Sequence, residues 1–458
     1  MCKKTQNNSN SDEKSADTHQ ATLFNLAEFQ RKPVEVRFNL PQTSSDGGLL
    51  LLREIENQIG IINKLASCIQ DTRHQGYVQH HIRTLLSQRI MQIAAGYEDA
   101  NDCNELRYDD IIKICSGSER LLASQPTMSR FENQLSRKEL YSMARVFVDL
   151  FVASYTNIPE IVILDCDDTD SIVHGQQQLS LFNTYYGDSC FMPLHIYEGL
   201  SGKLITTILK PGRRSKSVNV FAILQRLVSE LREQWPDTII ILRGDSHFCS
   251  KEFMDWSIDQ KNVEFITGLT GNAALDKLSK TTIESAQREY NFYKKPVKRY
   301  HSFEYKASSW EHSQRVVVKV EMNSKGLNVR YITSSMRCIS TKMLYENAYC
   351  ARGAAELRIK DHKTYLQSDR MSCNSFLANQ FRLFMHSAAY VLIHSLQHEV
   401  LKGTQYCNST MRTIQLKLIK VTARVKILKT KIQIELPTEF SSKLVFEKCF
   451  GILAELRI

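Results

Sequence analysis

Residues 161–170 read IVILDCDDTD, and this stretch decides the fold prediction. Four apolar residues lead into four carboxylates within six positions, namely Asp165, Asp167, Asp168 and Asp170. Carboxylates at the end of a buried strand repel one another and cost free energy to desolvate. A bound cation is the usual compensation, so the stretch predicts a strand that ends at a metal site.

Two enzyme classes carry such a stretch. DCDDT fits the D-x-D-x-T motif of the haloacid-dehalogenase-like phosphatases, in which Asp165 would be the nucleophile and Asp167 the acid. It also fits the first carboxylate strand of an RNase H-like nuclease or transposase. The phosphatase motif G-D-x-x-x-D would fall on GDSHFC, where Cys249 stands in place of the last aspartate. This mismatch weakens the phosphatase interpretation, because short motifs of this kind recur by chance.

The order of elements after residue 156 favours an α/β fold with an RNase H-like core. In that fold three strands, a helix, a strand, a helix and a strand follow one another, and the first and fourth strands are neighbours at the sheet centre. Short apolar runs that alternate with helical patterns fit this order. We expect strands at 160–168, 191–199, 203–212, 238–246 and 263–269, and helices at 217–235 and 251–260.

The spacing of apolar residues divides the rest of the chain into regions. Apolar residues at helical spacing predict an all-helical N-terminal region, and alternating residues later predict a β-rich insertion. Within the helical region, PTMSRFENQL (126–135) could form a DNA-binding helix-turn-helix, although plain helix packing would give the same pattern. The predicted organisation is a disordered tail (1–34), the helical N-terminal region (35–155), the core's first part (156–279), the β-rich insertion (280–340), the core's second part (341–400) and a helical basic C-terminal region (401–458).

Composition limits the functional class. The 458 residues include 59 Lys and Arg against 49 Asp and Glu, and the net charge of +10 favours a polyanionic partner. The chain has no run of eighteen apolar residues and no secretory h-region. Its 12 cysteines are scattered without a C-x-x-C pair, which argues against a zinc ribbon and for reduced thiols. We therefore expect a cytoplasmic protein.

The carboxylates of two predicted strands form half of a metal site. Alternate residues of a strand share a face, so Asp165 and Asp167 point one way and Asp168 points the other. Asp245 ends the predicted fourth strand, TIIILRGDS. If the first and fourth strands are neighbours, Asp245 lies beside Asp167.

The other half of the site is expected on a helix. Tyr349, Arg352, Glu356 and Lys363 occur within YCARGAAELRIKDHK. At 3.6 residues per turn their side chains fall within an arc of about 60°. A solvated charged face would also place charges in one line, and Arg352 and Glu356 could form an intrahelical ion pair because they are four residues apart.

This spacing resembles a known family. Tyr-two-Arg-three-Glu-six-Lys is the signature of bacterial insertion-sequence DDE transposases, and the chain looks most similar to insertion-sequence family thirteen-eighty, a relative of the family-four transposases. The similarity runs from about residue 35 to the C-terminus, although AELRIKD stands where relatives carry AENRIKE. Supporting stretches are GYEDAND (96–102), LASQPTMSRFEN (122–133), DCDDTDSIVHGQQ (165–177) and ILRGDSHFC (241–249).

The resemblance implies a catalytic triad of Asp167, Asp245 and Glu356, with Asp165 as the alternative first acid. These acids would hold two Mg²⁺ ions, with Mn²⁺ as a possible substitute, for in-line displacement at phosphorus. The implied reaction is cut-and-paste transposition of an element bounded by terminal inverted repeats, in a homodimeric synaptic complex on nucleoid-associated DNA. Expected phosphate contacts are Tyr349, Arg352, Lys363, Arg213 and Arg214.

Basic segments agree with a DNA partner. Residues 402–434 carry eight Lys or Arg and no Asp or Glu, and KPGRRSK and KKPVKR add local clusters. Such clusters are suited to neutralise a phosphate backbone. An inactive or domesticated transposase that only binds DNA is the alternative, and the intact triad argues against it.

Overall fold

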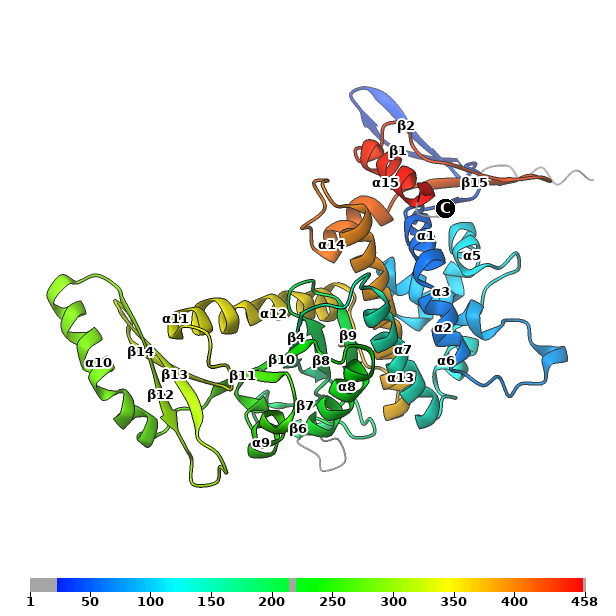
Figure 1. Ribbon diagram of the computed structural model, residues 1–458. Helices are drawn as coiled ribbons and strands as arrows, with labels where there is room; N and C mark the ends of the chain where they lie inside the picture. Colours follow the sequence, from blue (N-terminus) through cyan, green and yellow to red (C-terminus); the bar gives the residue numbers. More distant parts are fainter. Residues whose placement is uncertain (1–22, 214–219, 456–458) are drawn as a thin grey trace, which may run out of the picture.

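The computed structural model describes residues 23–213 and 220–455, and its centre is an eight-stranded mixed sheet (Figure 1). The strand order is β12-β13-β14-β11-β10-β4-β8-β9. Strands β4, β10 and β11 are parallel, whereas β8 is antiparallel to β4 and β9 is antiparallel to β8. The predicted adjacency of the first and fourth core strands, β4 and β10, is confirmed. The core strands are β4 (Ile161–Asp168), β8 (Leu194–Glu198), β9 (Leu204–Ile208), β10 (Ile239–Gly244) and β11 (Val263–Leu269).

Both faces of β4 are covered, which explains its apolar run. Val162 and Leu164 pack into a core with residues of α8 (Val220–Gln234) and α9 (Lys251–Asp259). On the opposite face Ile163 packs with the helical segment that begins at Thr341. Beside the end of β4 a small sheet is formed by β5 (Ser171–Ile172), β7 (Asp188–Phe191) and β6 (Leu181–Asn183), and η3 (Ser246–Phe248) follows β10.

The predicted β-rich insertion begins differently from expectation. Its first part, expected to be extended from residue 280, belongs to helix α10 (Ala273–Tyr293). The helix forms because Leu275, Ile283 and Ala286 lie on one face and pack against the following strands. Asn272 caps its first turn. The strands that follow, β12 (Val297–Tyr305), β13 (Gln314–Asn323) and β14 (Gly326–Ser334), continue the main sheet through β14, which pairs with β11.

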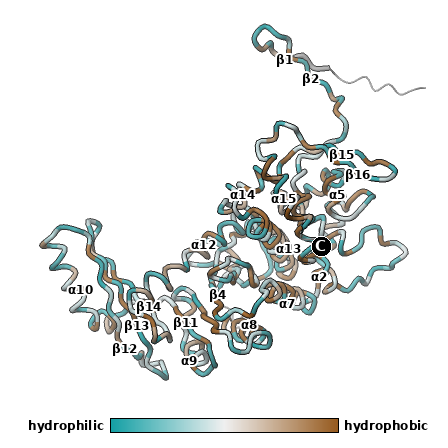
Figure 2. The backbone as a smooth tube through the Cα atoms, turned by 45° about the horizontal axis from the view of Figure 1, so that its top comes forward, coloured by the Kyte–Doolittle hydropathy of each residue, from teal (hydrophilic) through white to brown (hydrophobic). Residues whose placement is uncertain are grey.

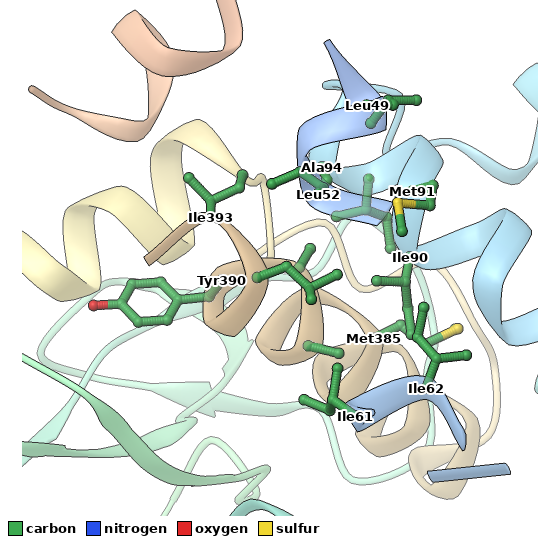
Figure 3. Close-up of a cluster of buried hydrophobic side chains, with 14 of the residues drawn as sticks. Leu49, Leu52, Ile61, Ile62, Ile90, Met91, Ala94, Met385, Tyr390 and Ile393 are labelled. Atoms are coloured by element: carbon green, nitrogen blue, oxygen red, sulfur yellow. The ribbon is translucent and has the colours of Figure 1, made fainter. Parts of the chain in front are cut away.

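A helical body adjoins the sheet, and both ends of the chain contribute to it. In Figure 3, Leu52 of α1, Met91 of α3 and Ile393 of α13 meet in this core. The N-terminal and C-terminal regions, expected as separate units, therefore share one core. The helices are α1 (Leu49–Ile59), α2 (Ile61–Ser67), α3 (Ile82–Ala94), α4 (Cys103–Leu106), α5 (Asp110–Ser116), α6 (Gln125–Glu132), α7 (Arg137–Ala153), α13 (Phe376–Ser395), α14 (Met411–Ile414) and α15 (Lys443–Glu455), with short turns η1 (Gln75–Tyr77), η2 (Ala100–Asp102), η7 (Leu396–Val400) and η8 (Gln415–Ile419).

Strands at both chain ends correct two predictions. Residues 23–34, expected to belong to a disordered tail, contribute to a hairpin of β1 (Leu23–Phe29) and β2 (Lys32–Arg37), and residues 1–22 lie outside the described part. The C-terminal region is not purely helical, because β15 (Ala423–Ile427) pairs with β16 (Ile432–Glu435) and with β3 (Thr43–Ser44). The β3–β15 pairing joins segments almost 380 residues apart, and local periodicity does not reveal such a partner.

Helix α13 is the centre of the helical body. It is buried along nearly its whole length, and Figure 2 shows it as largely hydrophobic. A helix that is buried on all sides is typical of a protein core, and the polar side chains that α13 buries have partners there, as in the ion pair of Arg382 with Glu132. Across residues 23–213 and 220–455, no helix has the combination of length and apolarity needed to cross a membrane.

Gly48 lies where the N-terminal part of the chain packs against the backbone of the C-terminal part, so a substitution there tests this contact. Its backbone N–H donates to the carbonyl of Ile419 at 3.1 Å, and a Cβ added to Gly48 would lie 1.8 Å from the Leu418 carbonyl oxygen. We expect Gly48→Ala to lower the free energy of unfolding by about 1–3 kcal/mol, because backbone must shift to admit the methyl group.

Chemical denaturation of purified protein would measure this loss. Gly451→Ala in α15 is the matched control, since beyond its chain neighbours and its own helix backbone nothing lies within 4 Å of the added Cβ, and we expect it to be neutral or stabilising. Equal stabilities of the two variants would contradict the docking of the two chain ends.

Candidate active site

The end of β4 places its acids on two faces. Asp167 faces the helical segment 341–365, where its Oδ2 accepts a hydrogen bond from Arg352 Nη1 at 2.8 Å. Asp168 faces the other way, and its Oδ2 pairs with Lys210 Nζ at 2.6 Å. The alternation predicted for Asp167 and Asp168 is thus confirmed.

Asp165 is occupied by a structural partner. It is 1% exposed, and both of its carboxylate oxygens accept hydrogen bonds from Arg243 of β10, one of them at 2.7 Å from Nη2. Arg243 also donates to the carbonyl of Ala348. The pair therefore ties β4, β10 and the helical segment together, and it leaves Asp165 without access to a substrate.

Asp245 lies beside Asp167. The parallel register pairs Gly244 with Cys166, so the next residues, Asp245 and Asp167, are level at the carboxyl ends of their strands. Asp245 also caps η3, accepting a hydrogen bond from the backbone N–H of His247 at 2.8 Å. Its position fulfils the geometric expectation for two carboxylates at neighbouring strand ends.

The electrostatics at Asp167 reflect this crowding. Burial raises the pKa of Asp167 to about 6, the negative charge of Asp245 acts in the same direction, and the Arg352 guanidinium opposes both. Arg352 is thus the positive charge that offsets the paired carboxylates.

The segment that carries the signature residues is helical, as predicted, but irregular. It consists of α11 (Thr341–Met343), a π-helical segment η4 (Leu344–Tyr349), a 3₁₀ turn η5 (Cys350–Arg352), α12 (Gly353–Lys360) and a second π-helical segment η6 (Asp361–Tyr365). Short π-helical segments are frequent at functional sites. The regular spacing of about 100° per residue, assumed for the predicted arc, is therefore not kept along this segment.

Three signature residues nevertheless converge on the end of β4. Arg352 bridges two acids, since its Nη2 lies 3.3 Å from Glu356 Oε1 while Nη1 bonds Asp167. Lys363 Nζ pairs with Asp170 Oδ1 at 2.9 Å. Glu356 is 63% exposed on its side chain and reaches Asp167 only through Arg352.

Tyr349 lies on the Asp245 side of the site. A Cβ on Gly268 of β11 would lie 3.0 Å from the Tyr349 hydroxyl oxygen and 3.3 Å from the Asp245 carbonyl carbon. Glycine at this position thus lets the Tyr349 ring pack over β11 next to Asp245. Burial raises the pKa of the Tyr349 hydroxyl, which keeps it protonated and able to donate a hydrogen bond.

Sequence reasoning missed two groups of side chains. Arg243 precedes Asp245 by two residues just as Asp165 precedes Asp167, so the parallel pairing of the two strands could have identified the ion pair. The second group lines a cavity of about 720 Å³ that opens beside Asp168 and includes Tyr185, Tyr186 and Lys210. No pattern in the sequence indicated it.

The two predicted basic contacts near this cavity have different outcomes. Arg213 lines the cavity and donates through Nε to the Phe182 carbonyl, whereas Arg214 lies outside the described residues. Within the described ranges, no group of three or more His, Cys, Asp or Glu side chains is arranged to hold a metal ion. Asp167 and Asp245 lie side by side, whereas the Arg352 guanidinium lies between Asp167 and Glu356 and pairs with both.

Comparison with known proteins identifies a family. A family model described as transposase DDE domain group 1 matches residues 26–458. No curated protein matches the chain. Among solved structures, a piggyBac transposase synaptic complex with hairpin DNA, determined by cryo-EM, matches with 12% identity, 83% of each chain covered and a TM-score of 0.42.

Proposed function

This chain belongs to the transposase DDE domain group 1 family and is a DNA transposase, and from that premise we propose its specific reaction. It acts on a bacterial insertion sequence of the family-thirteen-eighty type, within the cytoplasm on nucleoid DNA. It binds the terminal inverted repeats, cuts the strands and joins the element's 3′ ends to a target, as a homodimer that holds two ends. The sheet order β9-β8-β4-β10-β11 supports the RNase H-like core that this reaction uses.

The observation that carries the proposal is the set of acids joined by Arg352. Asp167 and Asp245 meet at neighbouring strand ends, and Glu356 is connected to Asp167 through one guanidinium. Asp165, the other candidate for the first acid, is committed to Arg243. The same commitment leaves the phosphatase interpretation without a nucleophile.

The donor set fits a hard divalent cation. Carboxylate oxygens are the ligands that Mg²⁺ prefers, and the mutual repulsion of Asp167 and Asp245 is relieved by a cation. We propose that Asp167, Asp245 and Glu356 hold two Mg²⁺ ions, which Mn²⁺ can replace. When bound, the ions would stabilise the attacking and leaving oxygens at phosphorus.

The protein's own groups would orient the DNA. Arg352 competes with a cation for the Asp167 carboxylate, and a DNA phosphate offers the guanidinium a bidentate partner in its place. Lys363 supplies a point charge beside Asp170, and Tyr349 donates a hydrogen bond from the Asp245 side. Water or a DNA 3′-hydroxyl is the nucleophile, so no covalent bond between protein and DNA forms.

A metal-dependent cleavage assay tests the proposal. The substrate is a DNA duplex that carries the element's terminal repeats with flanking sequence. We expect strand cleavage at the element's ends with Mg²⁺ or Mn²⁺ and none with EDTA. Specific binding of the ends without cleavage under any of these conditions would favour a domesticated, DNA-binding protein.

Lys363→Ala should weaken binding to specific ends and to unrelated DNA alike. The lysine contacts phosphate and not base edges in this proposal, so the plot of log K against log salt should become shallower by about one unit. Fluorescence anisotropy across a salt series would measure both effects. Lys261→Ala is the control, because Lys261 pairs with Asp237 at the opposite edge of the parallel strands. A change confined to specific ends would point to base recognition instead.

Arg352→Ala should impair cleavage more than binding. A guanidinium beside the reacting phosphate gains strength as charge develops there, so we expect a loss of about a hundredfold in single-turnover cleavage on pre-bound ends. Binding should change only fewfold. If cleavage stays within a fewfold of wild type at saturating DNA and Mg²⁺, Arg352 serves only as the ion-pair partner of Asp167 and Glu356.

A further inference from the structure

The arm, defined as α10 and β12–β14 (residues 273–334), begins at the candidate active site and leads away from it. Gly268, where an added Cβ would meet the Tyr349 hydroxyl and the Asp245 carbonyl carbon, pairs with Ile332 of β14. Gly326, six residues from Ile332, is at the far end of the strand. At about 3.3 Å per residue the tip therefore lies roughly 20 Å from the site along β14. Figure 1 shows the arm projecting away from the rest of the molecule.

The tip of the arm exposes two aromatic rings. Phe292 and Tyr293, at the end of α10, are 79% and 62% exposed, and their ring centroids are 4.8 Å apart in an edge-to-face arrangement. Each buries little surface within the chain, although such rings are among the residues that contribute most when buried. An exposed aromatic pair at the end of a projecting element indicates an interaction surface.

Lysines surround the aromatic pair. Lys294 and Lys295 follow it directly, within the KKPVKR run, and both are exposed. The strand register pairs Val297 with Met322, which brings the β13–β14 turn and its exposed Lys325 to the same end of the arm. In the part of the chain that the structure describes, these three lysines form no ion pair.

Nearby acids are already committed. Glu289 pairs with Arg299, and Glu321 pairs with Lys319 at 2.6 Å. The tip therefore presents uncompensated positive charge together with apolar rings. A partner that offers only phosphates would match the lysines but not the two rings. An acidic protein surface would likewise match the lysines but would give the rings no flat apolar surface. Duplex DNA offers both phosphates and the sugar and base edges of its minor groove.

We propose that the arm tip binds duplex DNA about six base pairs from the cleaved bond, with Lys294, Lys295 and Lys325 on phosphates and Phe292 and Tyr293 against the minor groove. The separation follows from the distance of about 20 Å and a rise of about 3.4 Å per base pair. The inference rests on the proposed function, because it places the cleaved bond at the carboxylates. It adds a second contact region, outside the active site, that lengthens the DNA segment the protein recognises.

The test measures how DNA affinity depends on the length of the duplex and on the positive charge at the arm tip. One duplex extends about 12 base pairs on both sides of the cleaved bond, a second is truncated to about 4 on the element side, and a third to about 4 on the flanking side. The tip variant is Lys294→Gln/Lys295→Gln/Lys325→Gln. The control is Lys277→Gln/Lys280→Gln, two exposed lysines toward the other end of α10.

We expect the tip variant to bind the long duplex about 10- to 100-fold more weakly than wild type, with a salt slope shallower by about two to three units. It should lose hydroxyl-radical protection about six base pairs from the cut. The truncation that abolishes the difference in DNA affinity between the tip variant and wild type identifies the side of the cleaved bond on which the arm lies. Phe292→Ala/Tyr293→Ala should lose the same protection with little change in salt slope.

Two outcomes would overturn the inference. Unchanged affinity and protection for the tip variant on the long duplex would exclude a DNA contact. A defect in self-association measured without DNA, with unchanged DNA affinity, would assign the tip to a second copy of the chain. Cleavage of the long duplex at saturating protein by wild type and tip variant alike reports on the proposed function separately, because this duplex keeps the end of the element next to the cleaved bond and the reaction does not need the arm.

Discussion

Asp167→Asn should abolish strand cleavage while leaving binding of the DNA ends nearly intact. The substitution keeps the volume of the side chain but removes the charge that faces Asp245 and Arg352. Removal of a proposed metal ligand eliminates stabilisation of the transition state, so we expect a loss on the order of a thousandfold or more. Single-turnover cleavage on pre-bound ends, together with anisotropy for affinity, would measure the two effects separately.

The control is the same substitution at an exposed aspartate far from the site. Asp237 lies on an exposed loop at the opposite edge of the parallel strands, and the Asp237→Asn protein should cleave DNA at the wild-type rate. Retention of cleavage by Asp167→Asn, within about tenfold of wild type, would remove Asp167 from the catalytic set.

Asp165→Ala should damage the fold and not only the reaction. It leaves the Arg243 guanidinium buried without its carboxylate, and loss of one partner of a buried ion pair typically costs about 3–5 kcal/mol. We expect a corresponding drop in the free energy of unfolding measured with urea.

A double variant separates charge from packing. Asp165→Leu/Arg243→Met replaces both partners by apolar side chains of similar size, and we expect it to recover much of the lost stability. If Asp165→Ala instead keeps wild-type stability and loses cleavage, Asp165 is the first catalytic acid and the assignment to Asp167 is wrong by two residues.

The difference between Asp165 and Asp167 shows what the sequence could and could not predict. Strand alternation places both on the same face, so the pattern alone left both open. The decision depends on the register of β4 against β10, which brings Arg243 to Asp165 and leaves Asp167 beside Asp245. The neighbouring strands themselves were predictable, because apolar runs that end in acids mark both of them.

Other parts of the fold were not predictable for a different physical reason. Helix α10 was not predicted, because residues 280–293 were assigned to the β-rich insertion on the alternation of the residues that follow them. The pairing of β3 with β15 and the shared core of the chain ends depend on contacts between distant segments. The π-helical segments η4 and η6, before and after α12, change the direction of the signature residues, and regular helical periodicity does not predict them.

The most direct test of the central claim locates the metal ion itself. Fe²⁺ is exchanged for Mg²⁺ in the complex of protein with its DNA ends, and ascorbate with peroxide then generates hydroxyl radicals that cut the polypeptide next to the ion. The account predicts cuts near Asp167, Asp245 and Glu356, all suppressed by excess Mg²⁺ and absent in Asp167→Asn. Cuts that cluster elsewhere, or cuts near Asp167 and Asp245 that never include Glu356, would contradict a single site built from the three acids.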